Sequence, residues 1–250
     1  MMTRAAQIPD RRLDFLVAGV MKGGTSALWN YLRQHPSIGM AESKELHFFD
    51  NDAFDWAKPD YDLLHSNFDG VADHKLLGEA TPGSTYWPPC IERIRAYNSG
   101  IRLIVTLRDP VARAYSHWRM VTSNNRETMS FSEAIREGRS RISESPRIYS
   151  YVERGFYGIQ FERIFSFFPR EQVHIVRQVD LLRDPAKTLS CIAEFLEIPS
   201  WPEMPQPENY YSLDDGTIPK EDDVLYLRQL YRDDMGKLFE LTGISIPDEF

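Results

Sequence analysis

The sequence has 250 residues, of which 42% are hydrophobic and 26% charged, and its formal net charge is −8. This length is enough for one large globular domain with a full core. The negative net charge argues against a general binder of nucleic acid, because such proteins rely on a surplus of Lys and Arg. The apolar runs, such as residues 15–20, are far shorter than the roughly 20 residues needed to cross a bilayer, and we expect no membrane span.

The ends and the cysteines of the sequence indicate a simple domain organisation. Residues 1–12 lack the apolar region and the cleavage site of a secretory signal, and we interpret them as a flexible leader before a single domain at 13–250. The two cysteines, Cys90 and Cys191, lie in unrelated segments and form no metal-like cluster. We therefore expect a reduced, cytoplasmic protein without a metal site.

Strand and helix patterns alternate along the chain. Residues 14–20 form an apolar run rich in strand-forming residues, and a glycine loop at 21–26 leads into a helical pattern. Further strands are predicted at 76–79, 102–107 and 173–177, each followed by a helical segment. This alternation predicts an α/β fold with a central parallel sheet flanked by helices, of the P-loop nucleotide-binding type.

Helix-start signals place three later helices. Pro110 opens a helix that should run to residue 118, Ser130 begins a capping box with Glu133, and an Asp-Pro pair starts a helix at 184–196. A proline-rich loop is predicted at 200–219, and a C-terminal helix at 221–242.

The loop after the first strand has the composition of an anion site. Gly23 and Gly24 let the backbone approach a ligand closely, and the following helix directs its free N–H groups to the same place. Lys22 adds a positive charge, and Thr25 and Ser26 add hydroxyl donors. In nucleotide triphosphatases the lysine follows the last glycine, whereas here it precedes both, which fits a phosphate cradle without the usual metal-binding arrangement.

Two segments carry a family resemblance. Residues 18–28, AGVMKGGTSAL, resemble the 5′-phosphosulfate loop of sulfotransferases that use 3′-phosphoadenosine 5′-phosphosulfate (PAPS), especially the heparan-sulfate type. Residues 104–117, IVTLRDPVARAYSH, resemble the 3′-phosphate motif of that family, in which an arginine and a serine bind the ribose 3′-phosphate. The matching positions are Arg108 and Ser116. The resemblance implies a sulfotransferase fold, PAPS as donor, and 3′-phosphoadenosine 5′-phosphate (PAP) as product.

A third segment, residues 43–50, is similar to the family segment whose glutamate deprotonates the acceptor. Glu45 is the matching residue. His47 lies two residues further on, and either it is the base itself or it orients Glu45. By the resemblance, Lys22 stabilises the leaving group.

The sequence departs from the heparan-sulfate type in two places. A second catalytic lysine is common there at the position of Ala80, which leaves the stabilisation of the leaving group to Lys22 alone or to a cation that the sequence does not identify. The late Lys-Gly-Arg loop is replaced by 214–219, where Gly216 is a weaker candidate for nucleotide contact.

Two alternatives to a sulfotransferase stay open from the residues alone. One is a P-loop kinase, and the other is a catalytically silent nucleotide-binding protein. For a sulfotransferase, the net charge favours a small-molecule, lipid-linked or neutral carbohydrate acceptor over a long sulfated glycan.

Overall fold

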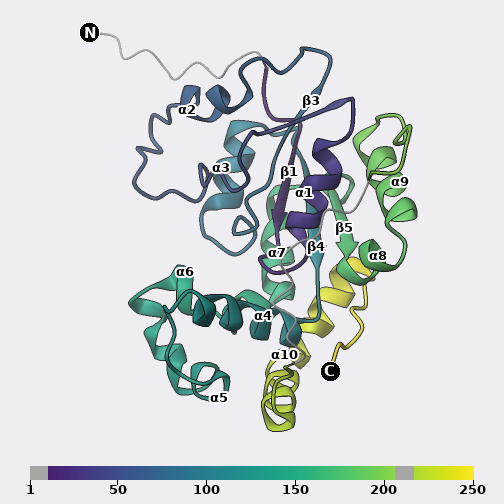
Figure 1. Ribbon diagram of the computed structural model, residues 1–250. Helices are drawn as coiled ribbons and strands as arrows, with labels where there is room; N and C mark the ends of the chain where they lie inside the picture. The colour runs from purple at the N-terminus through teal and green to yellow at the C-terminus, as the bar shows by residue number, and fades with distance from the viewer. Residues whose placement is uncertain (1–10, 206–216) are drawn as a thin grey trace. The chain divides into compact units, whose positions relative to one another are not determined.

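The computed structural model describes residues 11–205 and 217–250 (Figure 1). The chain divides into two compact units, and each is described by itself. The sheet unit comprises Met1–Val20, Gly24–Leu107 and Ile164–Asn209, and the helical unit comprises Met21–Gly23, Arg108–Arg163 and Tyr210–Phe250. Most of the predicted leader and Gly216 lie outside the described residues.

The sheet unit contains a five-stranded parallel sheet. Its order is β2-β3-β1-β4-β5, with β1 in the middle. All five residues of β1 are buried because strands pair on both edges and helices cover both faces. The strands are β1 (Phe15–Gly19), β2 (Ile38–Met40), β3 (Leu76–Glu79), β4 (Arg102–Leu107) and β5 (Val173–Arg177).

The structure confirms the predicted α/β class and the four predicted strands, and it adds β2. This strand has three residues and pairs with β3 at one edge of the sheet. Such a short segment carries no readable alternation of apolar and polar residues.

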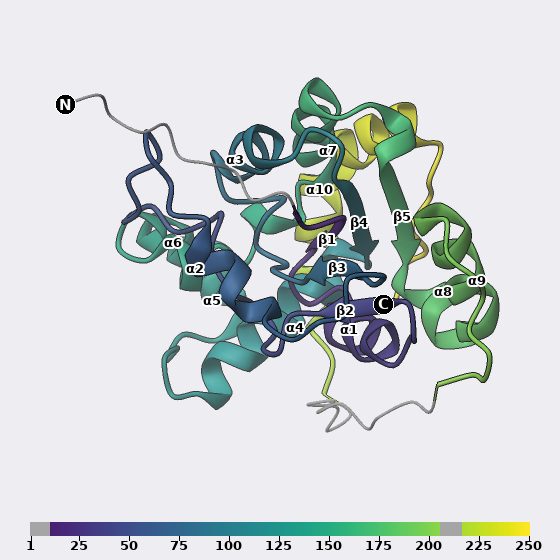
Figure 2. The same cartoon turned by 90° about the horizontal axis from the view of Figure 1, so that it is seen from above.

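Helices cover both faces of the sheet. On one face lie α1 (Thr25–Arg33), α8 (Gln178–Arg183) and α9 (Pro185–Leu196), whereas α3 (Cys90–Tyr97) lies on the other (Figure 2). Buried side chains of the first face form what we term the sheet cluster, which consists of Phe15, Val17, Leu28, Tyr31, Leu32, Ile38, Ala80, Ile104, Val176, Leu181, Leu189, Ile192 and Leu196. Short helical turns at α2 (Asp62–His65), η1 (Ser66–Phe68) and η4 (Arg170–Gln172) complete this unit.

The helical unit is built around two long helices, α4 (Pro110–Ser123) and α10 (Glu221–Thr242). Val111 and Tyr115 of α4 pack with Leu227 and Tyr231 of α10 in a common apolar cluster. The remaining elements are α5 (Phe131–Ala134), η2 (Glu137–Ser143), α6 (Pro146–Tyr149), η3 (Glu153–Gly155) and α7 (Tyr157–Phe167), which leads back to the sheet unit after Arg163.

Helix starts follow the predicted signals. The Asp109 side chain accepts a hydrogen bond from Val111 N (3.1 Å) and caps α4, which runs five residues beyond the predicted end at 118. The capping box of Ser130 and Glu133 is present. Helices α9 and α10 occupy the predicted ranges, and Asp184 caps α9 through Lys187 N (3.0 Å).

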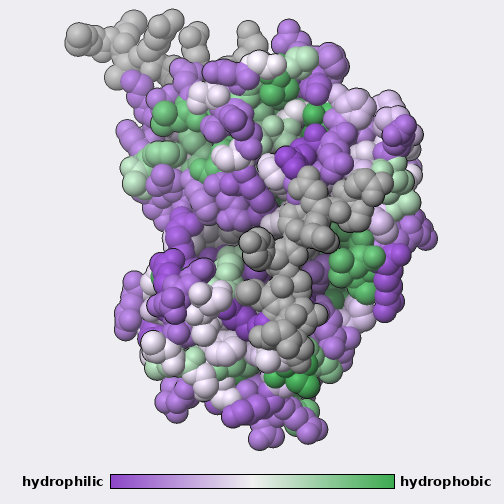
Figure 3. All heavy atoms as spheres, viewed as in Figure 1, coloured by the Kyte–Doolittle hydropathy of each residue, from purple (hydrophilic) through white to green (hydrophobic). Residues whose placement is uncertain are grey.

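The face of the molecule seen in Figure 3 is largely hydrophilic, with apolar side chains in separate patches. Among the described residues, no helix combines the length and the apolar character needed to cross a membrane.

Candidate functional site

The loop after β1 has a backbone that few residue types adopt readily. Val20 N donates to Thr106 O (2.9 Å) and fixes the end of β1 against β4. Lys22 and Gly24 then take left-handed conformations, with φ of 69° and 93°. A Cβ on Gly24 would also lie 3.1 Å from Gln178 Cγ. The left-handed φ therefore favours glycine at 24, and a Cβ there would also require the Gln178 side chain to shift slightly.

The loop opens into α1 without a side-chain cap. Gly24 is the N-cap residue and, as a glycine, supplies no side-chain cap to the first turn of the helix. The first N–H groups of a helix have no partner inside it, and the helix dipole adds a partial positive charge there. Thr25 is buried and Ser26 half-buried in this turn. This end of α1 is suited to bind an anion.

Lys22 and Gly23 belong to the helical unit, where Lys22 lies near other basic side chains. Burial and then the charges of Arg113, Arg154 and Lys22 hold the pKa of His117 well below its ordinary value. Arg113 and His117 are fully buried on α4. Arg113 Nη2 donates to Tyr151 O, but Arg113 Nε and Nη1 and both His117 ring nitrogens have no hydrogen-bond partner among the described residues.

The buried Arg113 guanidinium favours an anionic ligand nearby, because burying a cation without full hydrogen bonding is costly. Arg113 and His117 were not singled out from the sequence. The available signal was their position on α4, three residues before and one residue after the predicted phosphate ligand Ser116.

The predicted 3′-phosphate residues also lie in the helical unit. Arg108 directly precedes the α4 cap, and Ser116 is half-buried on α4. The Arg108 guanidinium is paired with the Glu249 carboxylate, with Nε to Oε1 at 2.9 Å and Nη2 to Oε2 at 2.7 Å. Tyr157 Oη donates to the Arg108 carbonyl (3.0 Å) and holds its backbone.

Asp109 organises the surroundings of Arg108. Its carboxylate accepts two hydrogen bonds from Arg228 (2.8 and 3.0 Å) and one from Glu249 N (3.0 Å), in addition to capping α4. Asp248, next to Glu249 in the chain, also pairs with Arg228 (2.7 Å). These contacts attach residues 248–249 to the start of α4. Neither contact was predicted.

In the sheet unit, Glu45 and His47 come together with a third residue, Asp50. His47 Nδ1 lies 2.9 Å from Asp50 Oδ2, and His47 Nε2 lies 3.6 Å from Glu45 Oε2. Lys44 Nζ donates to Glu45 Oε1. The side chains of Glu45 and His47 are 40% and 50% exposed, whereas that of Asp50 is fully buried. A buried carboxylate therefore orients an accessible imidazole beside an accessible carboxylate.

The charges of this group are coupled. The contacts with Asp50 and then Glu45 raise the pKa of His47 to about 9. Partial burial opposes ionisation of Glu45, but its contacts with His47 and Lys44 outweigh burial and lower its pKa to about 2. At neutral pH the Glu45 carboxylate is ionised and His47 is an imidazolium. Of these two residues, Glu45 is then the one in the deprotonated form that a proton acceptor requires.

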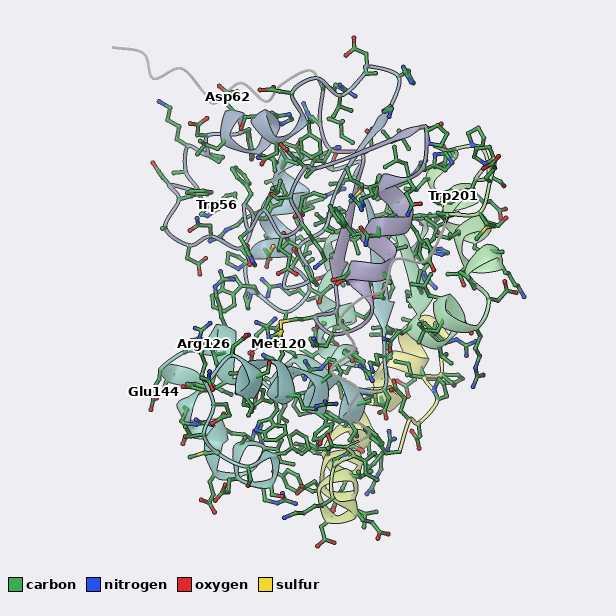
Figure 4. All side chains as sticks on the ribbon, in the orientation of Figure 1. Trp56, Asp62, Met120, Arg126, Glu144 and Trp201 are labelled. Atoms are coloured by element: carbon green, nitrogen blue, oxygen red, sulfur yellow. The ribbon has the colours of Figure 1, made fainter. Side chains whose placement is uncertain are left out.

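An aromatic group adjoins this segment. Phe48 and Phe49 are buried, and both contact Trp56, which is labelled in Figure 4. The Arg93 guanidinium lies 4.3 Å from the Trp56 ring centroid and pairs with Asp52 (2.8 Å). The cation nearest to these aromatic rings is thus already neutralised.

The residues predicted from the sequence divide between the two units. Gly24, Thr25, Ser26, Glu45 and His47 belong to the sheet unit. Lys22, Gly23, Arg108 and Ser116 belong to the helical unit.

Ala80 is 1% exposed within the sheet cluster, so its position offers no charged group. Across residues 11–205 and 217–250, no group of three or more His, Cys, Asp or Glu side chains is arranged to hold a metal ion.

Comparison with known proteins places this arrangement in a family. The model of the sulfotransferase domain matches residues 12–212, which run through both units. The chain belongs to the sulfotransferase family. A sulfotransferase from Alicyclobacillus acidocaldarius has a similar structure, with a TM-score of 0.83, 27% identity, and coverage of 94% of this chain and 97% of that chain. The sulfotransferase domain from the curacin biosynthetic pathway, 15% identical with a TM-score of 0.59, shares the fold.

Curated relatives within the family are heparan sulfate glucosamine 3-O-sulfotransferases. Isoform 5 from Mus musculus is 31% identical over 79% of this chain and 56% of its own length. Isoform 3B1 from Homo sapiens is 33% identical over 72% of this chain and 45% of its own length. The chain thus spans about half the length of these relatives.

The charge coupling at His47 gives the first testable prediction. Asp50→Asn removes the main partner of the imidazolium, and the pKa of His47 should fall from about 9 toward its ordinary value of about 6.5. Titration of the imidazole resonances by NMR, with His47→Asn to assign the signal, measures this directly. In wild type, the contacts of charged His47 should stabilise the fold fully below about pH 6.5, and this stabilisation should disappear as the pH rises through about 9. An unchanged His47 pKa in Asp50→Asn would contradict the assigned contact.

Proposed function

We propose that the protein transfers a sulfuryl group from PAPS to a hydroxyl or amine of a second substrate and releases PAP. The observation that carries the proposal is the sulfotransferase match over residues 12–212, which includes every predicted site residue except the weaker candidate Gly216. In the reaction, the acceptor oxygen or nitrogen bonds to sulfur as the bond between sulfur and the bridging oxygen of the donor breaks. Glu45 takes the proton of the acceptor.

The donor assignment is supported by the composition of the two anion-binding segments. We assign the 5′-phosphosulfate to Lys22, Gly23, Gly24, Thr25 and Ser26. The left-handed loop and the uncapped first turn of α1 support this assignment, because they offer backbone N–H groups and a positive dipole end. Lys22 stabilises the charge that develops on the bridging oxygen, an electrostatic role worth about 3 kcal/mol for one good donor.

We assign the 3′-phosphate to Arg108 and Ser116. A guanidinium fork binds phosphate oxygens in a bidentate geometry, and the Arg108 fork already binds a carboxylate in this way. The buried basic side chains of the helical unit supply further positive potential.

Glu45 is the proposed base, and His47 is its orienting partner. A side chain can accept a proton only in its deprotonated form, and at neutral pH the pKa values of about 2 for Glu45 and about 9 for His47 leave Glu45 in that form. Of the two alternatives that the sequence left open, this ordering favours Glu45 as the base.

The curated relatives are named for a glucosamine of heparan sulfate, whereas a different acceptor fits this chain better. We propose a small-molecule, lipid-linked or neutral carbohydrate hydroxyl. Three observations support it: the net charge is −8, Ala80 is buried and uncharged, and Arg93 is paired with Asp52. A polysulfated chain requires unpaired cations along its path. The two free cysteines support a reducing, cytoplasmic setting, which we also propose.

The direct test is transfer from isotopically labelled PAPS, with chelator present, to metabolites of a cell extract followed by mass spectrometry. We expect a product that has gained one sulfuryl group. Glu45→Gln should reduce the rate by about 100-fold or more without loss of PAP binding, because it removes the proton acceptor and keeps the size of the side chain. Glu42→Gln, which makes the same change at an exposed acid nearby, should keep the wild-type rate. The absence of any labelled product, or ATP-dependent phosphorylation instead, would refute the proposed reaction.

The Arg108–Glu249 pair generates a separate prediction about donor affinity. Because Glu249 competes with a phosphate for the same guanidinium, Glu249→Gln should tighten PAP binding by about two- to five-fold, as expected for a partly exposed ion pair worth up to about 1 kcal/mol. Calorimetry with PAP and with adenosine 5′-phosphate measures this.

Adenosine 5′-phosphate lacks the 3′-phosphate and should gain little affinity. Glu240→Gln, the same change of charge on the exposed face of α10, is the matched control and should leave PAP affinity unchanged. Equal gains for both nucleotides would show that Arg108 does not contact the 3′-phosphate.

A further inference from the structure

Glu79, the last residue of β3, is a carboxylate held inside the sheet unit. The residue is 2% exposed, and burial raises its pKa to about 7. Its Oε1 accepts hydrogen bonds from Thr81 Oγ1 (2.5 Å) and from Leu46 N (3.1 Å). Leu46 lies between Glu45 and His47, so the buried Glu79 side chain binds the backbone N–H that directly follows the proposed base.

The backbone around Leu46 is strained. Glu45 and His47 both take left-handed conformations, with φ of 64° and 51°. Residues other than glycine and asparagine rarely adopt this region, at a cost of about 1–2 kcal/mol each. Such a conformation persists only where neighbouring contacts hold it.

Three successive N–H groups provide those contacts, and all three bind to the end of β3. Glu45 N donates to Ala80 O (3.0 Å), Leu46 N to Glu79 Oε1 (3.1 Å), and His47 N to Thr81 Oγ1 (3.3 Å). The Thr81 hydroxyl accepts from His47 N and donates to Glu79, so the two side chains act as one unit. The end of β3 thus specifies the conformation of residues 45–47.

We propose that Glu79 and Thr81 are positioning residues that hold Glu45 and His47 in their reactive arrangement. The proposal rests on the proposed function, in which Glu45 is the base. Neither side chain has a part in the donor or acceptor contacts assigned above. Their effect on the reaction is exerted through the loop.

The chemistry of Glu79 favours this role over simple packing. A buried carboxylate costs free energy that an apolar side chain of similar volume would avoid. Within the described part of the chain, the Glu79 carboxylate accepts hydrogen bonds only from the Thr81 hydroxyl and from Leu46 N, which directly follows the proposed base. The charged groups that act on it are Asp50 and His47, which belong to the same site.

The test compares Glu79→Leu with Glu79→Gln. Leucine has similar size but no acceptor for Leu46 N, whereas glutamine restores one. In Glu79→Leu we expect kcat to fall at least about 10-fold at an unchanged KM for PAPS, and the His47 pKa, measured by NMR, to drop from about 9 toward about 6.5 as its contacts loosen. Glu79→Gln should recover most of both values.

Controls separate positioning from stability. Val176→Ala truncates the sheet cluster on β5, which β1 and β4 separate from β3, and it should lower stability while leaving the His47 pKa unchanged. Should Glu79→Leu fail to fold, Thr81→Val and Thr81→Ser decide the question, because only serine keeps the bridging hydroxyl.

A folded Glu79→Leu or Thr81→Val protein with a His47 pKa of about 9 and wild-type kcat would overturn the proposal. A lowered His47 pKa in an enzyme whose wild type transfers no sulfuryl group would support positioning and refute the proposed function instead.

Discussion

The parallel pairing of β3, β1 and β4 is the constraint on which the candidate site depends. Parallel strands end at the same edge of their sheet, and each of these three strands leads directly into a segment that carries candidate site or positioning residues. The glycine loop follows β1, residues 79–81 begin at the last residue of β3, and Arg108 and Asp109 follow β4. Hydrogen bonds between the strand ends, such as Val20 N to Thr106 O (2.9 Å), give these segments fixed starting points.

The two units differ in the electrostatic surroundings of their titratable groups. The helical unit gathers buried basic groups around Arg113 and keeps His117 neutral, an environment that favours a bound anion. In the sheet unit, Glu45 and His47 instead lie beside opposite charges, so that Glu45 stays ionised next to a protonated His47.

The sequence predicted those features that rest on local patterns. Apolar runs identified four strands, and the Asp109–Pro110 and Ser130–Glu133 signals identified helix starts, because caps act within a few residues. Family motifs indicated the loop and Arg108. Strand β2 was missed because three residues carry no period.

Long-range and conformational features could not be predicted. The pairing of Arg108 with Glu249 joins residues 141 positions apart. The left-handed backbone at Lys22, Glu45 and His47 occurs at residue types that rarely adopt it, so no composition signal marks it. The protonation order of Glu45 and His47 depends on Asp50, whose contact with the imidazole appears only in the folded chain.

Lys22 is proposed to act on charge that appears during sulfuryl transfer, and single-turnover kinetics of Lys22→Ala measure this role. Such a role stabilises the transition state more than the bound donor. We expect the rate of transfer to fall by about 100-fold, far more than the affinity for PAPS. A loss of affinity as large as the loss of rate would contradict it.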